Sequence, residues 1–153
     1  MKNFVFIIAL AFLSATAFSQ KVNFSGDWKL NKSKSELGYE FSIAPKAMKL
    51  EHTKKTLDLT RVLDFNGQEF EDKQHYTLDG EISENVGFEE SVTQSTANFD
   101  KKARTLKIVT EGTFQEMNYT HTQIFSMKED NMVVNSEIGS DMGGMVETFV
   151  FEK

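Results

Sequence analysis

The sequence contains no cysteine, and this excludes several classes of site at once. Cysteine nucleophiles, zinc–thiolate sites and iron–sulfur clusters all need thiolates, so none of them can be built from this chain. Disulfides are excluded as well, although exported proteins often use them for stability. A packed hydrophobic core must therefore hold the fold together, and of the 14 Phe four precede residue 20 and ten follow it.

Signals of helices and of enzymes are also scarce. After residue 19 no segment of helix length shows a 3.6-residue apolar period, and no apolar run is long enough to span a membrane as a helix. The chain has no Gly-x-Ser-x-Gly turn and no glycine-rich phosphate loop. We therefore predict no catalytic site, no cofactor, and no membrane span once a signal peptide has been removed.

The first residues have the pattern of a secretion signal. Lys2 precedes an apolar run over residues 4–13, and the small residues Ala17 and Ser19 suit a signal-peptidase cleavage between Ser19 and Gln20. The run is shorter than the ~20 residues that a membrane span needs, so removal is favoured over anchoring. The pattern predicts a periplasmic or secreted protein of a bacterial cell.

Length and charge limit what the exported part can do. Residues 1–19 are expected to be a signal peptide, and residues 20–153 have the size of one domain. The full chain has a formal net charge of −6, which removal of the signal makes slightly more acidic. An acidic protein is not attracted to nucleic acid or to anionic membranes, so neither is an expected partner. The identity of any protein partner is left open.

Short alternating segments fill the rest of the chain. Apolar and polar residues alternate over 24–30, 48–52, 57–65, 70–78 and 117–127. A period of two is typical of strands with one buried face. Since one such segment follows another, the sequence predicts an all-β domain.

Turn signals separate these segments. Asn66-Gly67 and Asp79-Gly80 are residue pairs that favour tight hairpins, and Gly112 indicates a further break or bulge. The one long interval without alternation, residues 31–45, is predicted to be a loop with one helical turn at residues 33–37. Turns recur about every ten residues, a spacing typical of an antiparallel up-and-down β-barrel or meander, with a closely related β-sandwich as the alternative.

Alternation alone does not decide which face points inward. An outer-membrane barrel is apolar outside and polar inside, and a similar number of strands would suffice. Arg61, Asp72, Glu84 and Glu147 fall on or beside apolar faces, where a charge in a bilayer is costly. The aromatic residues are also scattered rather than gathered at strand ends, so a barrel with an apolar interior is favoured.

The run Phe24-Ser25-Gly26-Asp27-Trp28-Lys29-Leu30 resembles the Gly-x-Trp first strand of lipocalins and fatty-acid-binding proteins. Together with residues 31–34 it is similar to small bacterial lipocalin-like exported proteins. The resemblance implies an antiparallel barrel of eight to ten strands around a cavity that is open at one end. It also implies that Gly26 lets the first strand bend at the barrel base, that Trp28 plugs the closed end, and that the loop 31–45 lies over the opening.

The chain departs from these families in several respects. Lipocalins often carry a late Arg that packs on the Trp, but no Arg follows Arg104. The other two lipocalin motifs have no clear counterpart, and the helix pair of fatty-acid-binding proteins is absent from the pattern. Their carboxylate-binding Arg residues cannot be assigned either, since Arg61 and Arg104 are the only arginines.

Alternation also selects candidates for the lining of a cavity. Arg61 stands on an otherwise apolar face, so it either pairs with an acid or meets an anionic ligand, and a structural pair is favoured. The full set consists of inward-facing aromatic, aliphatic and cationic side chains: Leu59, Arg61, Leu63, Phe70, Tyr76, Met117, Tyr119 and Phe125. A slip of one residue would invert every assignment.

Metal binding is not predicted. His52, His75 and His121 lie far apart in the sequence, without the short spacings of metal ligands. The late Met residues are interpreted as fillers of irregular apolar space rather than as copper ligands.

Two functional hypotheses remain. In the first, the exported barrel binds a small hydrophobic or amphipathic ligand in its cavity. In the second, side chains fill the barrel, which acts as a structural or protein-interaction module of the cell envelope, since an eight-stranded barrel is barely wide enough to be hollow.

Overall fold

A computed structural model describes residues 22–38, 41–87 and 90–153, and the predicted signal peptide at 1–19 lies outside these ranges. Ten antiparallel strands form one sheet in the order β4-β3-β2-β1-β10-β9-β8-β7-β6-β5. The elements are β1 (Gly26–Leu30), the 3₁₀ helix η1 (Lys32–Lys34), β2 (Ala47–His52), β3 (Thr56–Phe65), β4 (Gln68–Thr77), β5 (Asp79–Val86), β6 (Val92–Asp100), β7 (Thr105–Phe114), β8 (Met117–Lys128), β9 (Asn131–Ser140) and β10 (Gly143–Glu152).

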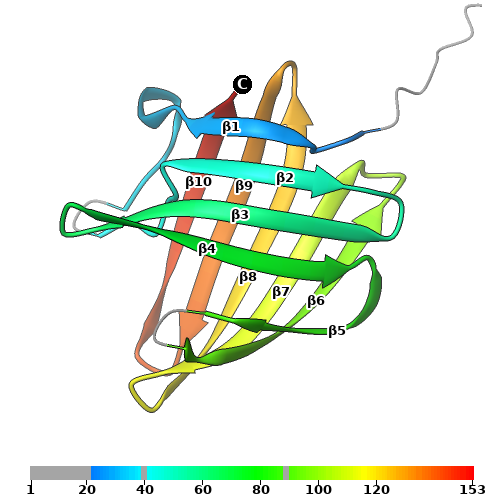
Figure 1. Ribbon diagram of the computed structural model, residues 1–153. Coiled ribbons are helices and arrows are strands. Elements are labelled where there is room, and N and C mark those ends of the chain that lie inside the picture. Colours follow the sequence, from blue (N-terminus) through cyan, green and yellow to red (C-terminus); the bar gives the residue numbers. More distant parts are fainter. Residues whose placement is uncertain (1–21, 39–40, 88–89) are drawn as a thin grey trace, which may run out of the picture.

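Consecutive strands pair along the whole sheet except at one place. The first and last strands, β1 and β10, pair with each other, whereas β4 and β5 are the two ends of the strand order. Strands β1 to β4 cross in front of β6 to β10, so the sheet wraps into a nearly closed barrel (Figure 1). The predicted up-and-down barrel of eight to ten strands is therefore confirmed, with ten strands. The alternative of a β-sandwich is wrong, because all ten strands belong to one sheet.

The turns follow the sequence signals in part. Asn66 and Gly67 have φ of 53° and 83°, and they form the tight turn between β3 and β4 as predicted. The chain also reverses near Gly80, but the bulged strand β5 does not join the backbone ladder of β4. The break predicted at Gly112 is wrong: this residue lies within β7, directly opposite Tyr119. A Cβ there would come within 2.6 Å of the Tyr119 hydroxyl, so glycine makes room for the ring.

The long loop after β1 is tied to the barrel wall. Its helical turn is η1, in which the Asn31 Oδ1 accepts a hydrogen bond of 3.1 Å from the Lys34 N–H, an N-cap contact. Glu36 then makes an isolated antiparallel bridge to Thr148 of β10. The predicted loop is therefore present and packs along β10.

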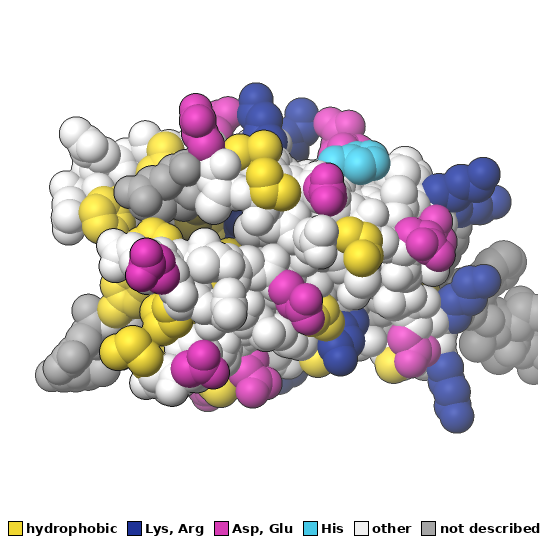
Figure 2. All heavy atoms as spheres, turned by 90° about the horizontal axis from the view of Figure 1, so that it is seen from below, with side chains coloured by type: hydrophobic (Ala, Val, Ile, Leu, Met, Phe, Trp, Pro, Cys, Tyr) yellow, Lys and Arg dark blue, Asp and Glu magenta, His cyan; other side chains and the backbone are white. Residues whose placement is uncertain are grey.

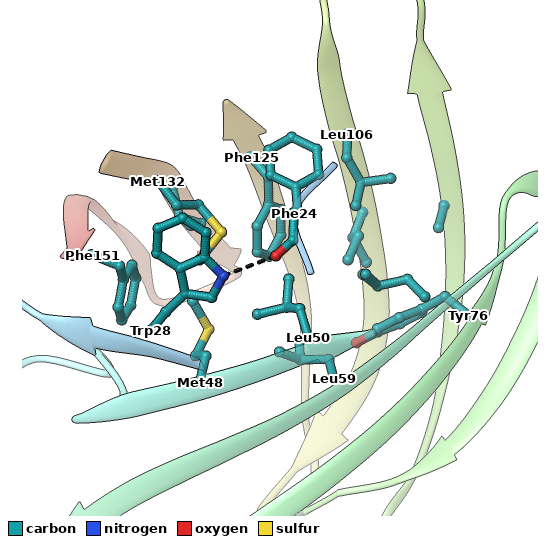
Figure 3. Packing of buried hydrophobic residues seen from close by; sticks show 14 of the residues in the cluster. Phe24, Trp28, Met48, Leu50, Leu59, Tyr76, Leu106, Phe125, Met132 and Phe151 are labelled. Carbon is teal, nitrogen blue, oxygen red and sulfur yellow. Dashed lines mark hydrogen bonds between the residues drawn. The ribbon is translucent and has the colours of Figure 1, made fainter. Parts of the chain in front are cut away.

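The hydrophobic core fills one end of the barrel, called the closed end here. Trp28 is 2 % exposed, and its Nε1 donates a 2.8 Å hydrogen bond to the carbonyl oxygen of Phe24. Side chains from β2 and β3 face those from β7, β8 and β9 across this end, as Figure 3 shows for Leu50 and Phe125. Complete burial of large aromatic side chains stabilises by about 3–5 kcal/mol each relative to alanine. Trp28 is thus one of the buried aromatic residues of this core.

A cation does pack on this tryptophan, although it is not an arginine. The Nζ of Lys153 lies 4.9 Å from the centroid of the Trp28 ring. The same lysine side chain is close to Gly26, whose φ of 143° suits glycine, and a Cβ at position 26 would lie 3.0 Å from the Lys153 Cε. Lys153 therefore packs its cation on the tryptophan ring, as the late Arg does in the lipocalin pattern.

The apolar face of most strands points inward. The alternation in β2 and β3 buries Met48, Leu50, Leu57 and Leu59, while the intervening charged residues are exposed. Strand β5 is an exception, since it buries polar side chains and exposes apolar ones. None of the described residues forms a helix that is long and apolar enough to cross a membrane.

Candidate ligand-binding site

A layer of polar side chains crosses the interior beyond the core, and the inward-facing Leu63, Phe70 and Met117 lie between this layer and the opposite, open end. Strands β3, β4, β8 and β9 each carry polar side chains at inward-facing positions beyond the core. We call these side chains the polar belt: Arg61, Asp72, Gln74, Tyr76, Tyr119, His121, Gln123 and Ser136.

Arg61 and Asp72 form an ion pair in the polar belt. They are direct partners on β3 and β4, with side chains only 19 % and 10 % exposed. The Arg61 Nε donates to the Asp72 Oδ2 at 2.7 Å, and the Arg61 Nη2 donates to the same oxygen. The Gln74 Nε2 donates to the other carboxylate oxygen at 2.7 Å. Of the two roles predicted for Arg61, the structural pair is the one that the contacts confirm.

The remaining members of the polar belt are uncharged near neutral pH. Burial, followed by the positive charge of Arg61, lowers the pKa of His121 to about 4, and its Nε2 lies 2.9 Å from the Ser136 Oγ. Burial raises the pKa of Tyr76 to about 12, and it also raises the pKa of Tyr119. The belt therefore offers hydroxyl, imidazole and amide groups that can donate or accept hydrogen bonds.

The eight residues predicted to line a cavity all occupy inward-facing positions, but at two depths. Leu59, Tyr76 and Phe125 belong to the fully buried core cluster. The other five lie nearer the open end and stay partly accessible: Arg61, Leu63, Phe70, Met117 and Tyr119. Whether any of the eight contacts a ligand stays a prediction.

Sequence reasoning placed Glu147 beside an apolar face without assigning it a role. Its side chain is buried in the barrel wall, on the inward face that also carries Phe149 and Phe151. The carboxylate accepts hydrogen bonds from the backbone N–H groups of Gly38, at 2.7 Å, and Ile43, at 3.2 Å. Glu147 therefore fixes both sides of the long loop to β10. The strict alternation along β10 was the signal that could have revealed this role.

The seam between β4 and β5 was also missed. Here side chains replace the backbone ladder: the Asn85 Oδ1 accepts from the His75 N–H at 2.7 Å, and the Asn85 Nδ2 donates to the His75 carbonyl at 3.0 Å. The Ser83 Oγ accepts from the Thr77 N–H at 3.0 Å. Because these side chains turn inward, Ile82 is 62 % exposed on the outer face, where it faces away from the core.

Apolar and acidic residues surround the open end. Phe41, Phe65 and Met142 are more than half exposed at the loops and turns of this end. Seen from below, hydrophobic side chains gather around a hollow on the left, whereas most Lys and Arg side chains lie toward the right (Figure 2). The other exposed turn residues at the open end include the acids Glu90, Glu116 and Asp141.

A separate groove of about 760 Å³ lies near the ends of β6 to β9. Its side chains are mostly exposed and polar, and they occupy positions that face away from the core, such as Gln94, Glu111 and Thr120. Of the polar belt, only Tyr119 contributes to it. This groove is therefore on the outer surface, and it does not represent the interior of the barrel.

The three histidines lie on different strands. His52 of β2 stacks on Phe24 with ring centroids 5.6 Å apart, and the His75 Nδ1 lies 2.7 Å from an Asp58 carboxylate oxygen on the outer surface. The described residues contain no group of three or more His, Asp or Glu side chains that could hold a metal ion.

The ten antiparallel strands and the core packed at one end define a barrel of the lipocalin-like class. No known family model matches the chain, and no curated protein matches it in sequence. Among solved structures it is similar to human cRBP IV, with a TM-score of 0.51 and 15% identity over 86% of this chain and 98% of that one. It is also similar to an abundant heat soluble (SAHS) protein from Ramazzottius varieornatus, with a TM-score of 0.59 and 10% identity over 85% and 94% of the two chains. These likenesses show the shared fold.

Proposed function

We propose that this chain is an exported lipocalin-like protein that binds a small hydrophobic or amphipathic molecule inside its barrel. The apolar part of the molecule lies toward the core at the closed end, and its polar part lies against the polar belt. Excluding water from the apolar part supplies most of the binding free energy, while the polar groups fix the orientation.

One observation carries this proposal: between the polar belt and the open end, inward-facing side chains are only partly buried. Phe70, Met117 and Tyr119 face inward near this end but stay partly accessible, as side chains that line a cavity do. A cellular retinol-binding protein has the same type of barrel, and its name denotes a small apolar ligand. That likeness supports the chemical class of the ligand proposed here.

Export is part of the proposal, and the pattern of residues 1–19 supports it. The protein is then periplasmic or secreted in a bacterial cell. Mass spectrometry of the protein from its own cells tests this directly: cleavage between Ser19 and Gln20 is expected. If the protein purified from these cells still carries residues 1–19, export by this route is contradicted.

Native mass spectrometry of the protein, purified from its own cells without detergent, tests binding. We expect a reproducible additional mass that is lost on denaturation. The variant Thr110→Phe inserts a ring at an inward-facing position of β7 and should abolish this mass. Thr113→Phe makes the same change at an exposed, outward-facing position of β7 and should leave it unchanged. A bare protein mass, with no thermal shift across a panel of lipids and pigments, would contradict the proposal.

A protein-interaction module is the second candidate, and the outer face of β5 and β6 favours it. Val86 and Val92 are cross-strand partners there, 60 % and 62 % exposed, and Ile82 is exposed on the same face of β5 four residues from Val86. Exposed apolar clusters are typical of protein-interaction sites. If the native mass is bare and a co-purifying protein is lost in the Val86→Lys variant, this second function replaces the first.

A further inference from the structure

We infer that the barrel selects a molecule whose polar end is uncharged, such as an alcohol or an amide, over a carboxylate of the same length. This inference rests on the proposed function, because it concerns the same interior. The reason is that Arg61, the only cation of the polar belt, is already neutralised by Asp72 of the chain itself.

The geometry of the pair leaves little for a ligand anion. Two nitrogens of the Arg61 guanidinium, Nε and Nη2, point at one oxygen of Asp72, and Gln74 occupies the other oxygen. The register fixes the pair, since Arg61 and Asp72 are direct cross-strand partners. A ligand carboxylate that binds the same edge of the guanidinium would have to displace a carboxylate that is part of the chain.

Displacement would also leave an uncompensated charge inside the barrel. The Asp72 side chain is 10 % exposed, and a buried carboxylate without its cation is strongly unfavourable. If the ligand anion instead bound beside the intact pair, the attraction of Arg61 and the repulsion of Asp72 would largely cancel. In either arrangement, a carboxylate loses its own hydration without gaining a free cation.

The rest of the belt suits a neutral polar group. His121 does not supply a second positive charge, because burial holds its pKa well below neutrality. Its ring already bonds to Ser136, while Gln123 is buried beside it on β8. An alcohol or amide can both donate to and accept from such groups without carrying charge into the barrel.

Charge around the opening favours the same class of ligand. The turns at the open end carry the exposed acids Glu90, Glu116 and Asp141. The turns at the closed end are mixed: they carry the cations Lys54, Lys55, Lys101, Lys102 and Arg104 together with the acids Asp100, Glu129 and Asp130. The cation Lys46 near this end is paired with Asp64 and Glu69, so the unpaired acids of the turns at the open end disfavour the approach of an anion.

Displacement of an uncharged fluorescent probe measures this selectivity. The full chain is loaded with N-phenylnaphthylamine, and dodecanol and dodecanoate are compared as competitors near neutral pH at equal ionic strength. The two competitors share their apolar part and differ at the polar end. We expect dodecanol to displace the probe at least about tenfold more effectively, which corresponds to about 1.4 kcal/mol.

Two variants assign the effect to the ion pair. Asp72→Asn leaves Arg61 without its anion, and we expect dodecanoate to gain about tenfold or more while dodecanol changes little. The double variant Arg61→Gln with Asp72→Asn removes both charges and should not bring this gain. Glu71→Gln removes an acid from the neighbouring, outward-facing position of β4, so it is the matched control and should behave as the wild type.

The outcomes separate the two proposals. If the wild type takes up the probe but dodecanoate competes as well as dodecanol, selection of a neutral polar end is wrong and binding in the barrel stands. If Asp72→Asn folds and dodecanoate gains nothing, the role of the pair is wrong. If the wild type binds neither the probe nor either competitor, the proposed function itself fails. The wild-type comparison needs no substitution, so it decides the inference even where a variant does not fold.

Discussion

Replacement of Asn85 by alanine tests how the barrel is closed between β4 and β5. The Asn85 side chain acts as a strand backbone, since it accepts from the N–H of His75 and donates to the carbonyl of the same residue. Each such bond contributes about 0.5–1.5 kcal/mol net, and a buried group left without a partner costs about 1–3 kcal/mol. Asn85 is 8 % exposed, so we expect Asn85→Ala to lower the free energy of unfolding by about 2–3 kcal/mol.

Urea unfolding and hydrogen exchange together measure this effect. For a chain of this size the loss corresponds to a fall in Tm of about 10 °C. The amide of His75 should exchange much faster in the variant, because its acceptor is the removed side chain. Asn118→Ala serves as the control, since the Asn118 side chain accepts only an exposed hydrogen bond from Thr113. Unchanged unfolding together with unchanged exchange at His75 would refute the closure by side chains.

A second substitution at the same position gives a dependence on pH. In Asn85→Asp the ionised carboxylate still accepts from the His75 N–H but opposes the His75 carbonyl oxygen. The folded state therefore disfavours the ionised form, so the pKa of the new carboxyl rises on folding. Stability should then be highest below the ordinary carboxyl pKa of about 4 and fall as the pH rises through it. An unfolding midpoint that improves with rising pH, relative to wild type, would contradict this.

Three further predictions concern the interior and the closed end. Arg61→Met should cost about 3–5 kcal/mol in urea unfolding because it leaves Asp72 buried without a cation, and the double variant with Asp72→Leu should regain most of it. The depressed pKa of His121, about 4 against 6.5, means that the unfolded chain takes up the proton first. Stability is then complete above about pH 6.5 and is lost as the pH falls toward 4, by about 3 kcal/mol, and His121→Gln should flatten this part of the profile. Lys153→Ala should cost about 0.5–1 kcal/mol through the ring of Trp28, and no cost should appear in a Trp28→Leu background.

Much of the fold follows from local signals in the sequence. Alternation identified the inward faces of β2, β3 and β8, because apolar side chains there pack into one core. The Asn66-Gly67 turn fixed a hairpin, since both residues tolerate positive φ. The prediction at Gly112 failed for a physical reason: glycine in a strand also permits close approach, and here it makes room for Tyr119.

The face of β5 could not be read from alternation. A hydrophobic pattern would place Ile82 and Val86 inside, but these residues lie outside and Ser83 and Asn85 lie inside. Those polar side chains are needed to bond the edge of β4, and that need arises only once the two strands meet without a shared ladder. Burial here is decided by a tertiary contact, which outweighs the local preference of the residues for water.

The pairing of Arg61 with Asp72 could have been predicted from the sequence, whereas the side-chain contacts between β4 and β5 could not. A two-residue turn at Asn66-Gly67 places residues that are equidistant from it opposite each other, and Arg61 and Asp72 are such a pair. The same logic does not connect β4 with β5, because a bulge interrupts the register of β5 and the link is made by side chains. The ion pair is thus a consequence of local turn chemistry, which makes it part of the barrel wall before any ligand arrives. For that reason an anionic ligand meets Arg61 only as a member of a pair.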